Sequence, residues 1–483
     1  MTLRRQLVHG TLWTSAGTYG SAAISFLVTL VLARILVPAD FGLIAAVVVF
    51  TGFLEAIADL GIGSSVVQQQ NLTPGELSSL FWAVMGVSCV VYGILLVAAP
   101  QLGRVLDLPL LPKVVPIVGI NTLLYGLLTI PLALVRQRLQ FKRAAVIQTV
   151  ATLVAGSVAL TLAASGYGYR ALVAQVVLAV VVRTAGLWFV AGWWPRLTFR
   201  ARDVAHSLAY SGPVIASVII NYWSRHLDAI LVARVAGVSA LGHYSLAQKL
   251  VGAPLILITN GVRPQLHPLF APIRDDAVRV RRAFRDTVGM TALLSFSIAG
   301  LLWVVAEPLV LAVWGPSWSP TIAIVRAFSI LAAVQPVTTL STSLYLTRGK
   351  TALMLRMTII NSLALIAAMV IGAEWGGAEG VAWAYSLVFA LVASPLATIT
   401  AYVRLFGGAP SDIARSLGLP SLCAAAILIA GTATDIALVQ AGLSPAIRLA
   451  GTVSAAGLAL LLVARLFAWP LVLAALRYMR PAQ

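Results

Sequence analysis

Long apolar stretches separated by short polar junctions fill almost the whole of this 483-residue chain. Most stretches are about 20 residues long, the length that a helix needs to cross the hydrocarbon core of a bilayer. A stretch such as Leu80–Ala99 has no polar face of the kind that a soluble surface helix carries. The pattern predicts an all-α membrane protein with about fourteen transmembrane helices. The expected spans are 11–33, 41–63, 79–100, 112–135, 145–165, 170–193, 210–233, 240–266, 288–312, 321–346, 352–373, 379–403, 418–438 and 445–470.

Basic residues gather at every second junction between these spans. The densest junctions hold Arg136, Arg138, Lys142 and Arg143 after the fourth span, and Arg274, Arg279, Arg281, Arg282 and Arg285 after the eighth. Because loops rich in Lys and Arg stay on the cytoplasmic side, we expect both termini in the cytoplasm. The junction after the second span (QQQNLTPGE) has no basic residue. The excess of Lys and Arg in cytoplasmic loops therefore holds for these loops taken together and not for each loop separately.

The net charge of +18 does not indicate a nucleic-acid partner, because the excess is spread over short loops and forms no single basic stripe. Anionic lipid head groups beside the membrane account for such charges. Two cysteines, Cys89 and Cys423, lie in separate spans. Their number and spacing favour neither a disulfide framework nor a metal site. We expect membrane lipids as partners, and neither nucleic acid nor a bound cofactor.

Two similar segments indicate an internal repeat. Ala33-Arg34 is followed by Pro38, Phe41 and Gly42, and Ala233-Arg234 is followed by Gly242, Tyr244 and Ser245. Six spans per unit make an even number of crossings, so the two units would have parallel orientation. This predicts two pseudo-symmetric six-helix lobes around a central cavity, at 1–200 and 201–410, and two additional C-terminal helices with a short tail at 411–483. Chance similarity of apolar helix ends is the alternative.

The segments ARILVPADFG, EAIADLGIGSSVVQQ and SRHLDAILVARVAG, with VSALGHYSLAQKL after the last, resemble a known family. They look like Wzx-type oligosaccharide-lipid flippases of the multidrug/oligosaccharidyl-lipid/polysaccharide exporter superfamily. The resemblance covers roughly residues 1–410. It implies that the chain moves undecaprenyl-diphosphate-linked oligosaccharide units across the bacterial inner membrane by alternating access, for lipopolysaccharide or exopolysaccharide synthesis. Polysaccharide polymerase and glycosyltransferases would be its partner enzymes.

Polar residues inside the seventh span are the first candidates for cargo binding. The span carries Asn221, Arg225, His226 and Asp228. A charge at the bilayer centre costs about 2.5–3.5 kcal/mol on insertion scales, so it usually faces a protein interior or an aqueous cavity. Arg225 and Asp228 stand three residues apart and share a helical face. Arg225 can bind phosphate oxygens through its planar fork; alternatively, the two form a buried ion pair that only fixes packing.

Three more basic residues lie within predicted spans and are candidates for the same cargo. Arg183 and Lys249 have no evident acidic partner in their own spans, and an anionic substrate would supply the missing charge. Arg263, near an inner end, is expected to interact with lipid head groups; the alternative is that it guides an incoming diphosphate. The alternatives are an ion pair between Arg183 and Glu55, and outward snorkelling of Lys249. Snorkelling is also the account we expect for Arg326.

Glu55 and Asp59 stand four residues apart on the second span and are candidates for ion coupling. Two carboxylates on one face can bind a proton or Na⁺, particularly where burial raises one pKa. The alternatives are pairing of the two carboxylates with a basic helix of the same lobe and a purely structural role for Asp59, beside the LGIG turn. Trp193, Trp194, Trp314 and Trp318 stand at span ends, where an interfacial belt is expected; Trp314 and Trp318 stacking on a sugar is the other interpretation.

Two other functions are weighed against the flippase. A membrane enzyme of lipid-linked sugars would need clustered acids, bases or a metal at one aqueous face, whereas the acids of the predicted outer loops are scattered. A drug/cation antiporter of the same superfamily would favour acidic residues in its cavity, whereas Arg183, Arg225 and Lys249 favour an anionic cargo. The sequence predicts a secondary-type transporter.

Overall fold

The structure is a computed structural model that describes residues 3–58, 66, 72–463 and 465–466. Over these residues its regular structure is helical and contains no strand. The N-terminal helices are α1 (Leu3–Ile35), α2 (Pro38–Ala58), α4 (Pro74–Val105), α5 (Leu111–Gln137), α6 (Phe141–Ala164), α7 (Tyr169–Ala191) and α8 (Ala201–Phe270). The later elements are η1 (Ala271–Ile273), α9 (Ala277–Val313), η2 (Pro316–Trp318), α10 (Pro320–Thr347), α11 (Thr351–Val388), η3 (Phe389–Ala393), α12 (Ser394–Ile399), η4 (Thr400–Arg404), α13 (Pro410–Gln440) and α14 (Pro445–Val463).

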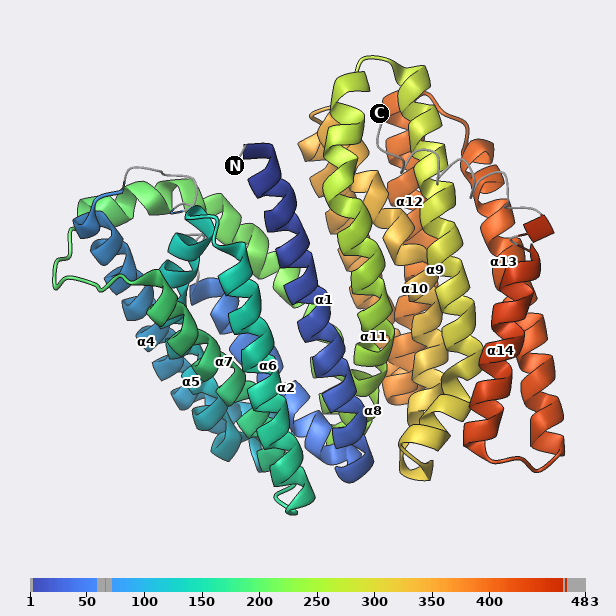
Figure 1. Cartoon of the computed structure of the whole chain (residues 1–483), viewed down its shortest axis with the longest axis horizontal. Helices are drawn as coiled ribbons and strands as arrows, with labels where there is room; N and C mark the ends of the chain where they lie inside the picture. Colours follow the sequence, from blue (N-terminus) through green and yellow to red (C-terminus); the bar gives the residue numbers. More distant parts are fainter. Residues whose placement is uncertain (1–2, 59–65, 67–71, 464, 467–483) are drawn as a thin grey trace. The chain divides into compact units, whose positions relative to one another are not determined.

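The chain forms two compact units, Met1–Ser245 and Leu246–Gln483, which divide within α8. In the N-terminal unit α1 packs on α6, α4 on α5, and α7 on both α5 and α6 (Figure 1). In the C-terminal unit α9 packs on α10 and α13, and α14 packs on α13 and α9. The predicted lobes, at 1–200 and 201–410 with the additional helices at 411–483, were defined by an internal repeat. A division into compact units does not test that repeat, so the lobes stay a prediction.

Two helices, α4 and α9, begin before the expected apolar spans and have polar capping residues at their starts. Thr73 and Glu76 form a capping box at the start of α4, in which the Glu76 carboxylate accepts from the Thr73 amide at 2.7 Å. The Asp276 carboxylate accepts from the amides of Val278 and Arg279 at the start of α9. Such caps satisfy amides that have no partner inside the helix. In α4 and α9, hydropathy predicts the apolar part of the helix, and the capping residues determine where the helix begins.

Two breaks interrupt the longest helices, and both fall between predicted spans. Gly237 in α8 has φ 86° and ψ 177° and lies between the seventh and eighth expected spans. Gly376 and Gly377 are non-helical within α11, between the eleventh and twelfth. Glycine adopts positive φ at little steric cost, so it suits such a break. Eleven helical segments of the described residues are long and apolar enough to cross a membrane; the predicted number of fourteen is not established.

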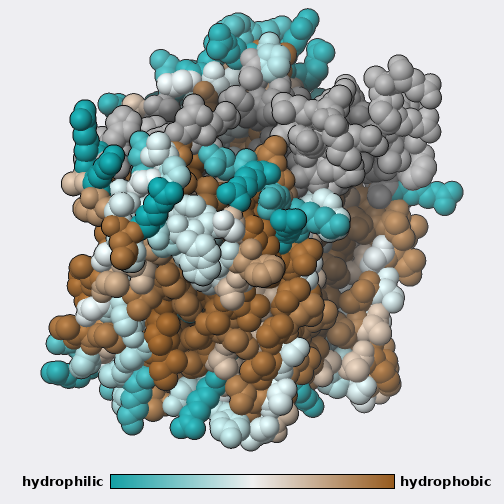
Figure 2. Space-filling view, turned by 60° about the vertical axis from the view of Figure 1, so that its left-hand side comes forward, coloured by the Kyte–Doolittle hydropathy of each residue, from teal (hydrophilic) through white to brown (hydrophobic). Residues whose placement is uncertain are grey.

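Large apolar side chains cover the outside of many helices. Examples are Val97 at 73% exposure, Phe189 at 91% and Leu391 at 72%. On the face drawn in Figure 2, apolar side chains form a band with polar side chains above and below it. A soluble monomer rarely exposes contiguous apolar surface of this kind. The band is the surface expected of a multi-pass membrane protein.

The two repeat-like segments meet inside the N-terminal unit. A Cβ added to Gly42 in α2 would collide with the carbonyl oxygen of Val238 in α8, and one added to Gly242 would collide with the carbonyl oxygen of Pro38. The start of α2 and the middle of α8 are therefore in backbone contact, which only glycine permits at these two positions.

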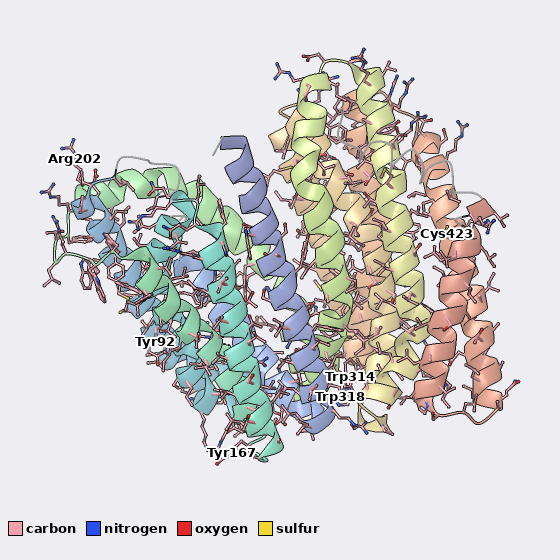
Figure 3. The ribbon with its side chains drawn as sticks, in the orientation of Figure 1. Tyr92, Tyr167, Arg202, Trp314, Trp318 and Cys423 are labelled. Atoms are coloured by element: carbon pink, nitrogen blue, oxygen red, sulfur yellow. The ribbon has the colours of Figure 1, made fainter. Side chains whose placement is uncertain are left out.

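Trp314 and Trp318 lie at helix ends, as expected, but they are not exposed as an interfacial belt would require. Trp314 is 3% exposed and Trp318 is 1% exposed, with their ring centroids 6.1 Å apart (Figure 3). Both pack into the protein at the junction between α9 and α10. Neither ring has a free face at the bilayer interface or for stacking on a sugar.

Candidate functional site

The polar face predicted on the seventh span lies in α8, and the structure describes part of it. Asp228 is 6% exposed, and its carboxylate accepts a hydrogen bond from the Tyr244 hydroxyl at 2.9 Å and one from the Ala229 amide at 2.8 Å. A buried carboxylate needs such donors. The side chains of Asn221 and Arg225 lie outside the described part of α8. The Arg225–Asp228 pair therefore stays a prediction.

Aromatic rings from α2 and α8 surround this part of the helix. The ring of Tyr222 lies 4.3 Å from that of His226, and the ring of Phe53 lies 4.7 Å from that of Trp223. The Tyr222 hydroxyl donates to the carbonyl of Val49 at 2.6 Å. These contacts hold α2 against α8 and give the polar face a fixed aromatic border. The sequence pattern does not reveal this border, because Val49 and Tyr222 are 173 residues apart.

The remaining basic candidates belong to different units. Arg183 is half-buried in α7 of the N-terminal unit, and Tyr125 and Arg136 of α5 are its electrostatic neighbours. Lys249 is exposed on α8 at the beginning of the C-terminal unit. Arg263 is also on α8, but its side chain lies outside the described part. Arg183 and Lys249 thus lie within candidate membrane spans, and their binding of cargo stays a prediction.

The coupling candidates lie at the edge of what the structure describes. Glu55 is in α2, but its side chain is outside the described part, and Asp59 lies outside the described residues. Ion coupling at these carboxylates stays a prediction. Among the described residues no group of three or more His, Cys, Asp and Glu side chains could hold a metal ion.

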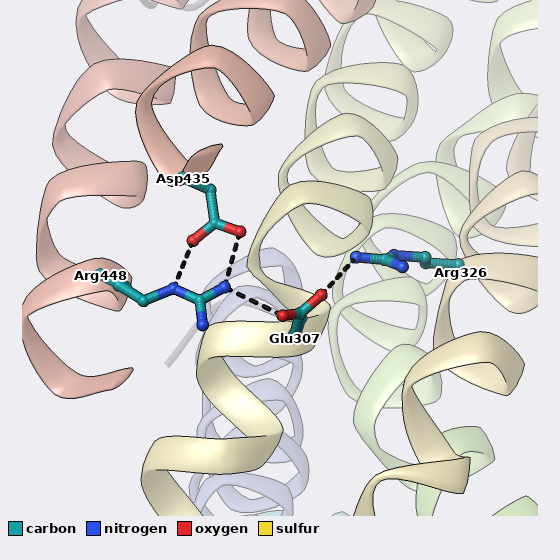
Figure 4. A network of polar contacts seen from close by, with 4 residues as sticks. All are labelled: Glu307, Arg326, Asp435 and Arg448. Carbon is teal, nitrogen blue, oxygen red and sulfur yellow. Dashed lines mark hydrogen bonds and ion pairs between the residues drawn. The ribbon is translucent and has the colours of Figure 1, made fainter. Parts of the chain in front are cut away.

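A four-residue charge network in the C-terminal unit was not predicted from the sequence. It consists of Glu307 on α9, Arg326 on α10, Asp435 on α13 and Arg448 on α14 (Figure 4). Arg448 is 7% exposed and donates to both oxygens of Asp435 at 2.9 Å and to Glu307 at 3.0 Å. Glu307 also accepts from Arg326 at 3.2 Å.

This network corrects the expectation that Arg326 snorkels outward. Arg326 instead points to Glu307, whose carboxylate bridges it to Arg448 (Figure 4). The pairing could not be found from spacing alone, since Glu307 and Arg448 are 141 residues apart. The one signal in the sequence was a set of opposite charges near four helix ends. The contacts join α13 and α14 to α9, so the network stabilises packing.

Comparison with known proteins decides the class to which this fold belongs. A model of the family described as "Polysaccharide biosynthesis protein" matches residues 31–323, which is more than half of the chain. The chain belongs to this family. Its curated relatives include the lipopolysaccharide biosynthesis protein WzxC of Escherichia coli (strain K12), with 26% identity over 91% of this chain and 89% of that protein. The succinoglycan biosynthesis transport protein ExoT of Rhizobium meliloti (strain 1021) is 27% identical over 64% of this chain and 62% of that protein.

Solved structures show the same fold at low sequence identity. The lipid II flippase MurJ in an inward closed conformation matches 95% of this chain and 100% of its own, with a TM-score of 0.76 and 13% identity. An inward-facing multidrug resistance MATE family transporter of the MOP superfamily matches 82% of this chain and 96% of its own, with a TM-score of 0.64 and 12% identity.

These findings confirm the family recognised in the sequence and the all-α membrane fold. The relatives are proteins of polysaccharide biosynthesis, and the structural neighbours are flippases and transporters. This member of the polysaccharide biosynthesis family is accordingly a multi-pass membrane protein, similar to proteins that are named as transporters.

Proposed function

We propose that this family member moves an undecaprenyl-diphosphate-linked oligosaccharide unit across the bacterial inner membrane. The observation that carries the proposal is its similarity to relatives named for lipopolysaccharide and succinoglycan biosynthesis, one of which it matches over 91% of its length. These polymers differ in their sugars, so the common element is a sugar-bearing precursor. The MurJ-like fold supports a lipid-linked precursor, because MurJ is a lipid II flippase.

The charges within the spans fit a diphosphate better than a cationic drug. Arg183 and Lys249 lie on α7 and α8 within candidate membrane spans, and Arg225 is the third cation of this set. An arginine guanidinium can donate two parallel hydrogen bonds to phosphate oxygens, whereas lysine supplies a point charge. In this proposal Asn221 and Asp228 orient Arg225, and Arg263 receives the diphosphate at the inner end.

The proposal includes an orientation and an energy source. Both termini lie in the cytoplasm, consistent with the basic junctions, and the two lobes alternate between inward-open and outward-open states around the cargo. Glu55 and Asp59 take up a proton or Na⁺ to couple the cycle. Polysaccharide polymerase and glycosyltransferases act on the same lipid-linked unit, before or after its transfer.

Depletion of the protein tests the cargo directly. We expect a lipid-linked oligosaccharide to accumulate in the inner leaflet, because its synthesis continues while its export stops. Mass spectrometry of extracted lipids, before and after depletion, measures the accumulation. If no such lipid accumulates and drug sensitivity changes instead, the cargo assignment is wrong and the antiporter function is supported.

The same depleted cells test Arg225 by complementation. Arg225→Ala should restore less than about a tenth of the wild-type export, because a charge-assisted contact to phosphate is lost. Arg225→Lys should restore part of it, since ammonium keeps the charge without the fork. Arg234→Ala is the matched control, because Arg234 is an exposed arginine of the same helix. Full export by an Arg225→Ala/Asp228→Ala double variant would show that the pair serves packing alone.

A further inference from the structure

A basic cavity lies at the end of the C-terminal unit where α9 begins. Its volume is about 340 Å³, and the residues that line it include Arg281, Arg282 and Arg285 of α9. The opposite wall is formed by Tyr402 of η4 and by the turn that leads into α13 up to Asp412. Three guanidinium groups against one carboxylate leave the cavity with a net positive charge.

One of the arginines, Arg281, holds the wall of the cavity, and the other two, Arg282 and Arg285, are accessible to a ligand. The guanidinium of Arg281 donates to the carbonyl oxygens of Phe406 at 3.3 Å and Gly407 at 2.8 Å. Arg285 lies 3.9 Å from the Asp412 carboxylate and remains 39% exposed. Arg282 is exposed, and among the described residues it has no hydrogen-bond or ion-pair partner.

The turn opposite the arginines is fixed independently of any ligand. Gly407 has φ 64°, and a Cβ on Gly408 would collide with the Tyr402 ring, so both positions require glycine. The Tyr402 hydroxyl and the Ala409 amide both donate to Asp412, at 3.3 and 3.4 Å. Asp412 is thereby satisfied within the wall. The Asp412 carboxylate therefore already has donors within the wall, and it forms no ion pair with Arg282.

The cavity lies at the ends of three candidate membrane spans, where lipid head groups are expected. α9, the segment that ends at Arg404 and α13 are candidate membrane spans, and the cavity lies at the end of all three. Arg285 stands one helical turn before Val288, the first residue of the expected span and fully buried. Val278, which is 57% exposed, adds an apolar wall beside the charges. Arginine beside apolar surface at this level suits an anionic lipid.

We propose that this cavity binds the phosphate of an anionic phospholipid head group, with Arg282 and Arg285 as its ligands. The two side chains stand three residues apart on α9 and share a face. Arg281 positions the turn and does not need to contact the lipid. The site belongs to the C-terminal unit alone and is independent of the cargo proposed above.

Native mass spectrometry of the purified full-length protein tests this site. The protein is mixed with equal amounts of phosphatidylglycerol and phosphatidylcholine, and the bound lipids are counted. We expect wild type to retain phosphatidylglycerol preferentially, and Arg282→Gln/Arg285→Gln to weaken that binding about tenfold through loss of charge-assisted contacts. Arg285→Lys should retain an intermediate preference.

The matched control is Arg274→Gln/Arg279→Gln. These arginines are in the same basic junction, are 67% and 74% exposed, pair with Asp275 and Asp276, and do not line the cavity. The control should bind phosphatidylglycerol as wild type does. Equal loss in the control, or unchanged binding in a cavity variant whose thermal unfolding matches wild type, would overturn the site. Complete displacement of the lipid by millimolar inorganic phosphate would overturn its assignment to a lipid.

Discussion

Single glycines determine how closely two parts of the N-terminal unit approach. Gly42 of α2 lies against the carbonyl oxygen of Val238, and Gly242 of α8 lies against that of Pro38. Any side chain at either position would push α2 away from α8. Backbone at this distance forms weak contacts between Cα–H groups and carbonyl oxygens. The close packing of α2 on α8 therefore requires glycine, which has no side chain, at positions 42 and 242.

Gly242→Ala should destabilise the protein by about 1–3 kcal/mol or more, because the new methyl group overlaps the Pro38 carbonyl. The measurement is the thermal unfolding midpoint of the purified protein, together with its abundance in membranes. Gly252→Ala is the control, since a Cβ at that position of the same helix meets nothing within 4 Å. Equal behaviour of the two variants would contradict the close backbone contact.

At the scale of elements, the charge network decides how the last two helices are attached. α13 and α14 pack on α9 through apolar residues such as Val304 and Ile427. Arg448 adds hydrogen bonds to Asp435 and Glu307. Removing one member of such a group leaves a buried charge without its partner, which costs more than the pair contributes. The last two helices are thus part of the C-terminal unit.

Arg448→Gln should destabilise the C-terminal unit by about 3–5 kcal/mol. Asp435, whose side chain is only 14% exposed in the intact network, would then lose its cationic partner. Arg448→Gln/Asp435→Asn should recover part of this loss, since Glu307 still has Arg326. Thermal unfolding in detergent measures both effects. Arg415→Gln is the control, as Arg415 is an exposed arginine of α13. A single variant as stable as the control would mean that the network is too hydrated to affect packing.

The positions of most helices could be predicted from hydropathy, but their ends and partners could not. The expected span 112–135 lies within α5 at Leu111–Gln137, because apolar composition and helix length agree there. The expected span 79–100 is shorter than α4 at both ends. At its start, Thr73 caps the helix outside the apolar stretch. The partner of Arg326 was missed for another reason, since an ion pair depends on tertiary neighbours that periodicity does not encode.

At the scale of the whole molecule, the distribution of Lys and Arg predicts on which side of the membrane each loop lies. Arg202 and Tyr167 lie at opposite ends of the N-terminal unit (Figure 3). In the C-terminal unit, Arg274 precedes α9 and Ser317 follows it. α9 is 37 residues long, which is enough to cross a bilayer. Each pair should therefore be divided between the two sides of the membrane.

Cysteines placed singly at these positions test the topology in a cysteine-free background. A membrane-impermeant maleimide added to intact cells should label Tyr167→Cys and Ser317→Cys, whereas Arg202→Cys and Arg274→Cys should react only after the membrane is opened. Permeabilised cells provide the control for accessibility. Labelling of Arg274→Cys and Ser317→Cys from the same side would show that α9 does not cross, and the parallel repeat would fall with it.

The charge network also bears on the order in which the chain enters the membrane during synthesis. Its four charges divide into Glu307 with Arg326 on α9 and α10, and Asp435 with Arg448 on α13 and α14. Each pair lies within two consecutive helices and is neutral by itself. An unpaired charge that enters the hydrocarbon region has an insertion cost, which is largest at the bilayer centre and smaller near helix ends such as these, and pairing within a hairpin reduces that cost at once. Each hairpin can therefore leave the translocation machinery already neutralised, and the contact between Arg448 and Glu307 forms when the two hairpins meet.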